Sequence, residues 1–209
     1  MTGEALAPHT LVLVERHADG REIVEVSDRS GWRRWLAERH EQRDATWLVF
    51  HKKTSDGTSP SYEEAVEEAL CFGWIDSTVK RLDEQRNLQL FAPRKPRSTW
   101  SASNKERVAR LEREGLLAPA GIAAIEVAKG NSSWSALDSV ERLEEPPDLA
   151  AALDADAAAR ENWNSFSPSS RKGILWWVVS AKRPETRAKR IEQTARMAAK
   201  GLRAQFDRE

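Results

Sequence analysis

The stretch SYEEAVEEALCFGWID, residues 61–76, changes its hydrophobic period halfway, which predicts a helix followed directly by a strand. Ser61 with Glu64 three residues later forms a capping box, which satisfies backbone N–H groups at a helix start. Apolar residues then recur at helical spacing as far as Gly73, a residue type that commonly ends helices. From Trp74 the pattern has a period of two, which is typical of a strand.

The same patterns extend outward from this stretch. Before it, two β-branched runs around Asp19-Gly20 predict a hairpin with that pair as its turn. After it, strict alternation places Asp76 and Lys80 on the strand face of Trp74. The N-terminal elements that we expect are a hairpin at 11–28, a helix at 30–39, a strand at 46–53, a helix at 61–72 and two strands within 74–92.

Helices are predicted for most of the remaining chain. Ser103 with Glu106 forms a second capping box, and Gly115 closes the helix that follows. Pro119 lies in the first turn of another short helix. The C-terminal third has helical patterns throughout, including the apolar run ILWWVV, which predicts a helix buried on all sides.

The predicted fold class is α+β. A small, mainly antiparallel sheet is expected from residues 10–93, carrying the helices at 30–39 and 61–72. The pair Pro146-Pro147, in an irregular acidic stretch, predicts the boundary between an α+β domain at 1–145 and a helical domain at 146–209. The helical part is expected to pack on the first through Trp163, Trp176 and Trp177.

The composition excludes several classes of protein. The 33 basic residues equal the 33 acidic ones, so net charge predicts no partner. A single cysteine, Cys71, allows no internal disulfide, and it lies in an apolar run that predicts burial. No signal peptide and no transmembrane segment is expected, which together with the single cysteine favours a cytoplasmic location.

Metal and cofactor sites are not expected. The four histidines, His9, His17, His40 and His51, lack metal-ligand spacing. The glycine-rich nucleotide motifs and the GxSxG hydrolase motif are missing from the sequence. We therefore predict no metal ion and no cofactor.

The charge is unevenly distributed along the chain. Residues 80–113 hold ten basic and four acidic residues, and residues 171–190 hold seven basic and one acidic. Residues 141–161 hold seven acidic and two basic residues. The basic blocks can form a positive face, but the acidic block can equally fold back over them.

The loop FAPRKPRSTWS, residues 91–101, combines charge with an aromatic ring. Arg94 and Arg97 can grip a carboxylate or phosphate, and Trp100 offers a stacking surface. The alternative is a surface loop whose arginines pair with acidic residues while Trp100 anchors it to the core. The predicted ligand-binding residues are Trp74, Asp76, Lys80, Arg94, Arg97, Ser98, Trp100 and Asn104.

Two further features carry alternatives. Asp76, on a strand in an aromatic setting, is either a general acid or base with a shifted pKa or the partner of a nearby Arg or Lys. The stretch AKRPETRAKRIEQ predicts a helix whose basic face contacts phosphates, lipid headgroups or an acidic partner, or is simply solvated. The residues of this basic surface are Lys182, Arg183, Arg187 and Arg190.

Four blocks of the sequence together resemble the YdeI/OmpD-associated family, also called bacteriocin-protection proteins. The blocks are EEALCFGWID, FAPRKPRSTWSASNKERV, EGLLAPAGIAAIEVAK and SAKRPETRAKRI. The resemblance runs from about Trp47 to Gly201. It implies a link to tolerance of antimicrobial peptides and bacteriocins and to an outer-membrane porin, and it carries over no catalytic residue.

Three functional hypotheses follow. The first is a non-enzymatic cytoplasmic stress-tolerance protein that binds a small anionic ligand or an acidic protein partner through the loop at 91–101. The second is a nucleic-acid-binding protein that uses the two basic blocks. The third is an enzyme with Asp76 as its acid or base.

Overall fold

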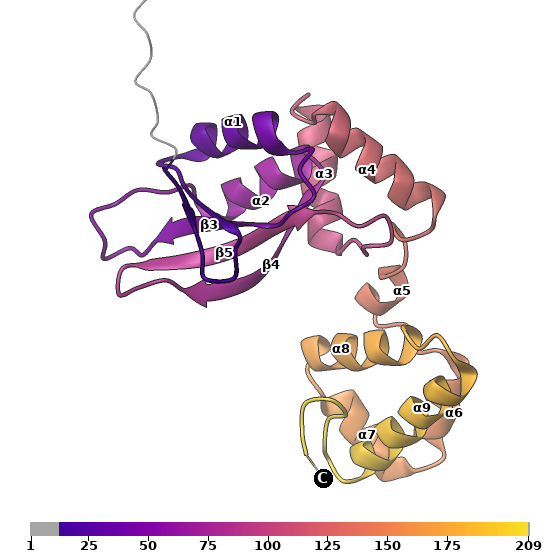
Figure 1. Ribbon diagram of the computed structural model, residues 1–209. Helices are drawn as coiled ribbons and strands as arrows, with labels where there is room; N and C mark the ends of the chain where they lie inside the picture. The colour runs from indigo at the N-terminus through magenta and orange to yellow at the C-terminus, as the bar shows by residue number, and fades with distance from the viewer. Residues whose placement is uncertain (1–12, 209) are drawn as a thin grey trace, which may run out of the picture. The chain divides into compact units, whose positions relative to one another are not determined.

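The computed structural model describes residues 13–208, which form two compact units that divide between Trp134 and Ser135 (Figure 1). The first unit combines a sheet with helices and the second is helical, so the predicted α+β class is confirmed. The division lies upstream of the Pro146-Pro147 pair, where the sequence predicts a boundary. Among the described residues, no helix combines the length and hydrophobicity that a membrane span requires.

The sheet of the first unit is mixed but mainly antiparallel, as predicted. Its strands are β1 (Leu13–Arg16), β2 (Glu22–Glu25), β3 (Thr46–His51), β4 (Trp74–Arg81) and β5 (Arg86–Pro93), in the spatial order β1-β2-β3-β5-β4. Only the β2–β3 pair among these strands is parallel. The predicted hairpin is confirmed with Gly20 at a positive φ in its turn, although its residues 11 and 12, like His9, lie outside the described part of the chain.

The helices of the first unit build one large core. They are α1 (Arg29–Arg39), α2 (Tyr62–Cys71), α3 (Ala102–Arg113) and α4 (Pro119–Gly130). Helices α1 and α2 cover one face of the sheet (Figure 1), and Trp32, Leu70 and Phe91 lie in the core between them. The opposite face carries a smaller cluster of Ile23, Trp47, Val49 and Leu88.

Charge is also buried in this unit. Glu67 and Glu68 on α2 are 3% and 2% exposed. Arg29 and Arg33, one turn apart on α1, both bind Glu68, while Arg110 of α3 binds Glu67. A buried carboxylate is tolerated only when it is paired, so these contacts fix how α1 and α3 lie on α2.

A bulge in β4 corrects the predicted strand face. Asp76 pairs with Phe91 of β5, but Val79 pairs with Gln89, so three residue steps on β4 match two on β5. The extra residue turns the following side chains over. Lys80 therefore lies opposite Leu88, on the sheet face away from Trp74 and Asp76.

Helix caps both confirm and correct the sequence predictions. The capping box of Ser61 and Glu64 is present, and Gly73 follows α2 with a φ of 73°. The second predicted box is wrong. Helix α3 starts earlier, because the hydroxyl of Ser101, and not that of Ser103, accepts the N–H of Asn104.

The second unit is a compact helical bundle. Its elements are α5 (Asp138–Glu141), α6 (Pro147–Asp154), α7 (Ala157–Ser165), α8 (Pro168–Val179) and α9 (Pro184–Ala199). Trp163 is fully buried in its core with Leu175 and Val178. The prediction that α8 is buried on all sides is wrong, because Trp176 is 37% exposed. Packing of this unit on the first through Trp163, Trp176 and Trp177 stays a prediction.

A pair of glycine substitutions in α4 tests the close contact between α4 and the end of α2. A Cβ at Gly121 would lie 2.2 Å from the carbonyl oxygen of Cys71, whereas one at Gly130 would meet nothing within 4 Å. We expect Gly121→Ala to lower the free energy of unfolding by about 1–3 kcal/mol, because backbone cannot yield. Gly130→Ala should leave it unchanged or raise it by up to about 1 kcal/mol. Urea denaturation followed by tryptophan fluorescence measures both, and equal effects would contradict the contact.

Candidate functional site

The junction between α2 and β4 positions the first residue of the candidate site. Gly73 adopts a left-handed conformation that turns the chain from the helix into the strand. Trp74 then pairs with Pro93, and the carbonyl of Gly73 accepts the N–H of Arg94 at 2.9 Å. Arg94 is therefore held by its backbone at the point where β5 ends.

The guanidinium of Arg94 stacks on a buried indole. Its Cζ lies 3.6 Å from the centre of the Trp100 ring, and its Nη1 donates to the carbonyl of Thr99 at 3.1 Å. Its Nε is buried and has no hydrogen-bond partner among the described residues. Burial lowers the pKa of Arg94 to about 10, although the negative charge of Asp76 acts in the opposite direction.

A pocket of about 180 Å³ adjoins this stack. Arg94, Lys95, Pro96 and Trp100 line one side. Small side chains of α4 form the other: Ala123, Ala124, Val127 and Ala128. The pocket therefore combines apolar walls with a cationic group, which suits a small ligand that has an apolar body and an anionic end.

Asp76 lies near this pocket and binds two neutral groups. Its Oδ2 accepts the hydroxyl of Tyr62 at 2.7 Å and the amide of Gln89 at 3.4 Å. The prediction that Asp76 pairs with an Arg or Lys is wrong for the chain as described, since no cation lies within ion-pair distance of it. Partial burial and the bond to Asp76 raise the pKa of Tyr62 to about 12.

The sequence patterns do not predict the contact between Tyr62 and Asp76. Helical periodicity assigns Tyr62 to the apolar face of α2, yet its side chain is 50% exposed and turns to Asp76. The partner lies 14 residues away on β4, so the contact depends on the α2–β4 turn. No local motif carries that information.

The structure does not gather all of the predicted ligand-binding residues. Trp74 is a core residue whose indole N–H binds the carbonyl of His40. Lys80 lies beyond the bulge. Its Nζ is 4.9 Å from the centre of the Trp47 ring and 3.9 Å from Oδ2 of Asp19. Arg97 is exposed on the loop, and the backbone N–H of Ser98 donates to the carbonyl of Lys95. Asn104, on α3, accepts a hydrogen bond from the guanidinium of Arg107. Arg94 and Trp100 thus form the site, with Asp76 beside them.

Among the described residues, carboxylates pair with much of the basic block in the first unit but with only two of the seven basic residues of 171–190 in the second. In the first unit, Arg86, Arg107 and Arg110 bind Glu25, Glu63 and Glu67. In the second unit, the acidic segment 141–161 covers part of the basic surface, because Asp148 binds Arg187 and Glu141 binds Lys172. Arg190 donates to the carbonyl of Trp177, whereas Lys182 and Arg183 are exposed.

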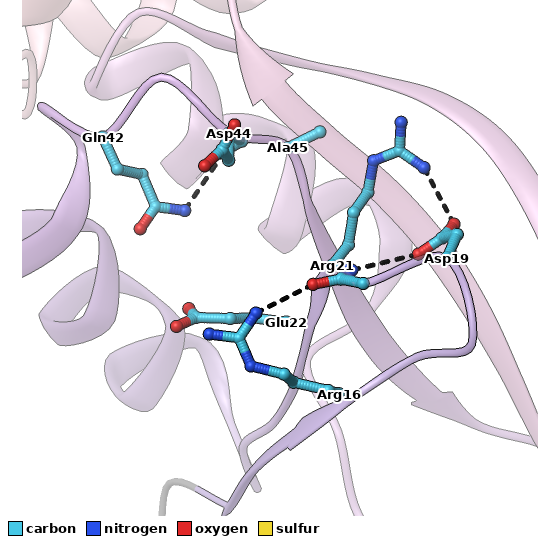
Figure 2. A pocket seen from close by; sticks show the side chains of 8 residues that line it. Arg16, Asp19, Arg21, Glu22, Gln42, Asp44 and Ala45 are labelled. Atoms are coloured by element: carbon cyan, nitrogen blue, oxygen red, sulfur yellow. Dashed lines mark hydrogen bonds and ion pairs between the residues drawn. The ribbon is translucent and has the colours of Figure 1, made fainter.

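A second cavity, of about 370 Å³, lies between the β1–β2 hairpin and residues 42–45 (Figure 2). Both of the arginines that line it have partners within the lining. Arg21 binds Asp19 at 2.8 Å, and Arg16 donates to the carbonyl of Gly20. Burial opposes the charge of Asp19, but hydrogen bonds from Arg21, His17 and Trp47 outweigh it and hold the pKa of Asp19 below its usual range. Oε2 of Glu22, which lines this cavity, is buried without a hydrogen-bond partner among the described residues, but the cavity offers no aromatic or apolar wall of the kind that Trp100 and α4 give the pocket beside Arg94.

The single tyrosine of the chain makes the Tyr62–Asp76 contact directly measurable. We expect absorbance at 295 nm to report tyrosine ionisation with a pKa of about 12 in the folded protein. Asp76→Asn should move that pKa toward the ordinary value of about 10, since the charge that opposes ionisation is removed. The stabilisation linked to Tyr62 should be full below about pH 10 and lost as the pH rises through about 12.

Asp83→Asn is the matched control, because Asp83 binds Arg86 and not Tyr62. Circular dichroism at each pH confirms that the protein stays folded during the titration. An unchanged tyrosine pKa in Asp76→Asn would contradict the contact.

Two family models match the chain. A domain of unknown function, DUF8412, matches residues 24–124, which contain the candidate site. The family described as Bacteriocin-protection, YdeI or OmpD-Associated matches residues 142–201, which lie in the second unit. Neither the curated proteins nor the solved structures yielded a match. The predicted resemblance to the bacteriocin-protection, YdeI or OmpD-associated family is therefore confirmed for residues 142–201, whereas the blocks predicted from residue 67 to residue 129 lie outside that match.

Proposed function

We propose that the first unit binds a small organic anion in the pocket beside Arg94, in a protein with a bacteriocin-protection-like role. The role that we propose for this pocket is binding without catalysis, and it belongs to stress tolerance in the cytoplasm. The site geometry supports the ligand, and the family match of residues 142–201 supports the role.

The observation that carries this proposal is the state of the Arg94 side chain. Its guanidinium is desolvated, its charge has no carboxylate partner among the described residues, and its Nε lacks a hydrogen bond. An arginine that only stabilises a fold normally has its N–H groups satisfied. A carboxylate in the pocket would supply the missing negative charge and accept from the guanidinium N–H groups that it can reach.

The size and walls of the pocket define the ligand class. A volume of about 180 Å³ equals roughly six water molecules at about 30 Å³ each. Ala124 and Val127 offer only apolar contact, and Trp100 offers its ring. We infer a monocarboxylate with a small ring or branched chain, since a group of that size fills such a volume.

The other two hypotheses have less support. Nucleic-acid binding needs many cations free to contact phosphates, and Arg86, Arg107 and Arg110 of the first unit already bind carboxylates. The exposed Lys182 and Arg183 of the second unit are its main support. An enzyme with Asp76 as acid or base has one supporting contact, the hydroxyl of Tyr62. Neither hypothesis accounts for the unsatisfied Nε of Arg94.

Benzoate is a suitable probe because it joins one carboxylate to one small ring. We expect isothermal titration calorimetry of the full chain with benzoate to give a Kd on the order of 1 mM or tighter, as fits a ligand of this size. Benzamide, the neutral analogue, should bind at least about tenfold more weakly, since charge-assisted hydrogen bonds are lost. Arg94→Met should weaken benzoate binding by the same order.

Arg97→Met is the matched control, because Arg97 lies on the same loop but is exposed and does not line the pocket. It should bind benzoate like the wild type. Equal affinity of wild type and Arg94→Met, or equal affinity for benzoate and benzamide, would exclude the proposed site.

The cellular role has its own test. In cells that lack the protein and have lost bacteriocin tolerance, wild type and Arg97→Met should restore tolerance, whereas Arg94→Met should not. If Arg94→Met restored bacteriocin tolerance fully, ligand binding in the pocket would not be needed for tolerance.

A further inference from the structure

A hydrogen-bonded chain of three side chains lies away from the Arg94 site. Both ring nitrogens of His51 are engaged: Nδ1 lies 2.8 Å from the hydroxyl of Ser55, and Nε2 lies 2.7 Å from Oε1 of Glu25. His51 ends β3 and Glu25 ends β2, and these strands are parallel neighbours. The carboxyl ends of two adjacent strands thus bring the acid and the imidazole together.

The partners of His51 set the direction of both hydrogen bonds when the imidazole is neutral. The Glu25 carboxylate can only accept, so in neutral His51 the proton lies on Nε2 and is donated to Glu25. Nδ1 then carries a lone pair and accepts the hydroxyl proton of Ser55. This is the order of donor and acceptor that a serine nucleophile, its base and the orienting acid require.

Glu25 is itself held in place. Its second oxygen, Oε2, accepts from Nη1 of Arg86 at 2.9 Å, and Arg86 also binds Asp83 through Nε at 2.8 Å. His51 pairs with Arg86 across the β3–β5 ladder, so their side chains share one sheet face. Acid and imidazole are therefore pre-positioned on strands and not on the loop.

The loop after β3 brings Ser55 onto the imidazole. The N–H of Gly57 donates to the hydroxyl oxygen of Ser55 at 3.1 Å, a contact that favours negative charge on that oxygen. A Cβ at Gly57 would lie 2.1 Å from Cε1 of His51, so only glycine allows the loop this close. The N–H of His51 binds the hydroxyl of Ser59, which secures the far side of the loop.

An open cavity of about 430 Å³ gives access to the serine. Residues of the loop and of the β4–β5 turn line it: His51, Ser55, Gly57, Asp83, Glu84, Gln85 and Arg86. Its volume exceeds that of the pocket beside Arg94 and can hold an ester of moderate size. Its carboxylates disfavour anionic substrates.

We propose that Ser55 is an activated nucleophile for acyl groups, with His51 as its general base and Glu25 as the residue that positions His51. The substrate class is a neutral or cationic carboxylic ester. This activity is separate from the proposed anion binding and uses none of its residues.

The reaction consists of two balanced steps. Oγ of Ser55 bonds to the ester carbonyl carbon while its proton passes to Nδ1 of His51, and the bond to the leaving oxygen breaks as that oxygen takes the proton from His51. This gives acyl-Ser55 and an alcohol. Water then attacks the acyl group in the same way, giving a carboxylic acid and restoring Ser55.

A fluorophosphonate probe tests the proposal on the intact chain, because it phosphonylates an activated serine with loss of fluoride. Peptide mass spectrometry of the labelled wild type should place the adduct on Ser55. Ser55→Ala should not label, and His51→Gln should label about 10²- to 10⁴-fold more slowly. Thr54→Ala, which removes a neighbouring exposed hydroxyl from the same loop, should label like the wild type.

Glu25→Gln separates positioning from folding. The amide keeps an acceptor for Nε2–H but turns its N–H₂ group toward Arg86 in place of Oε2. The melting temperature should therefore fall while the protein stays folded at the labelling temperature, and labelling should slow. Absence of labelling in the wild type, labelling at other residues, or a rate that His51→Gln leaves unchanged would each overturn the proposal. The adduct site is located on the wild-type protein, so the test holds even where a variant fails to fold.

Discussion

Glu67 and Glu68 are adjacent on α2, and burying two neighbouring carboxylates in a helix interface requires cations from the surrounding elements. Helix α1 supplies Arg29 and Arg33 from one face, and α3 supplies Arg110. Because leaving either carboxylate unpaired would be strongly destabilising, these ion pairs favour the observed packing of α1 and α3 on α2. The apolar core around Leu70 then fills the space that these ion pairs define.

The position of Arg94 depends on the packing around α2, but among the described residues Arg94 lacks the carboxylate partner that the arginines bound to α2 have. The end of α2 is fixed by its neighbours, so Gly73 can direct β4 beside β5 and hold the N–H of Arg94. The arginines that bind α2 are partly exposed and have carboxylate partners, whereas Arg94 is more deeply buried and has only the ring of Trp100 and one carbonyl. Incomplete satisfaction of a buried cation is unusual in a structural role, and it distinguishes Arg94 from the other arginines of the unit.

Sequence patterns predict the elements of this fold well because caps, turns and periodicity are local. Ser61, Gly20 and Gly73 each act within a few residues, and the structure places them as predicted. The bulge at Asp76–Val79 is set by pairing with β5, so strict alternation misplaces Lys80. The burial of Glu67 and Glu68 is likewise hidden, since a charged pair on a helix normally indicates a solvated face. Trp100 is foreseen as a ring beside Arg94, but the α4 wall of the pocket is a tertiary contact.

The Ser55 cluster also depends on a tertiary contact, so no local sequence motif indicates it. Ser55 and His51 are four residues apart, but Glu25 comes from another strand, and only the parallel β2–β3 pair joins them. The cluster and the Arg94 site are also physically separate, because Arg86 and Arg94 lie at opposite ends of β5, roughly 26 Å apart at about 3.3 Å per residue. Sites at that distance without shared partners act additively. Binding at one site and acylation at the other can therefore be lost independently, so each proposal stands on its own residues.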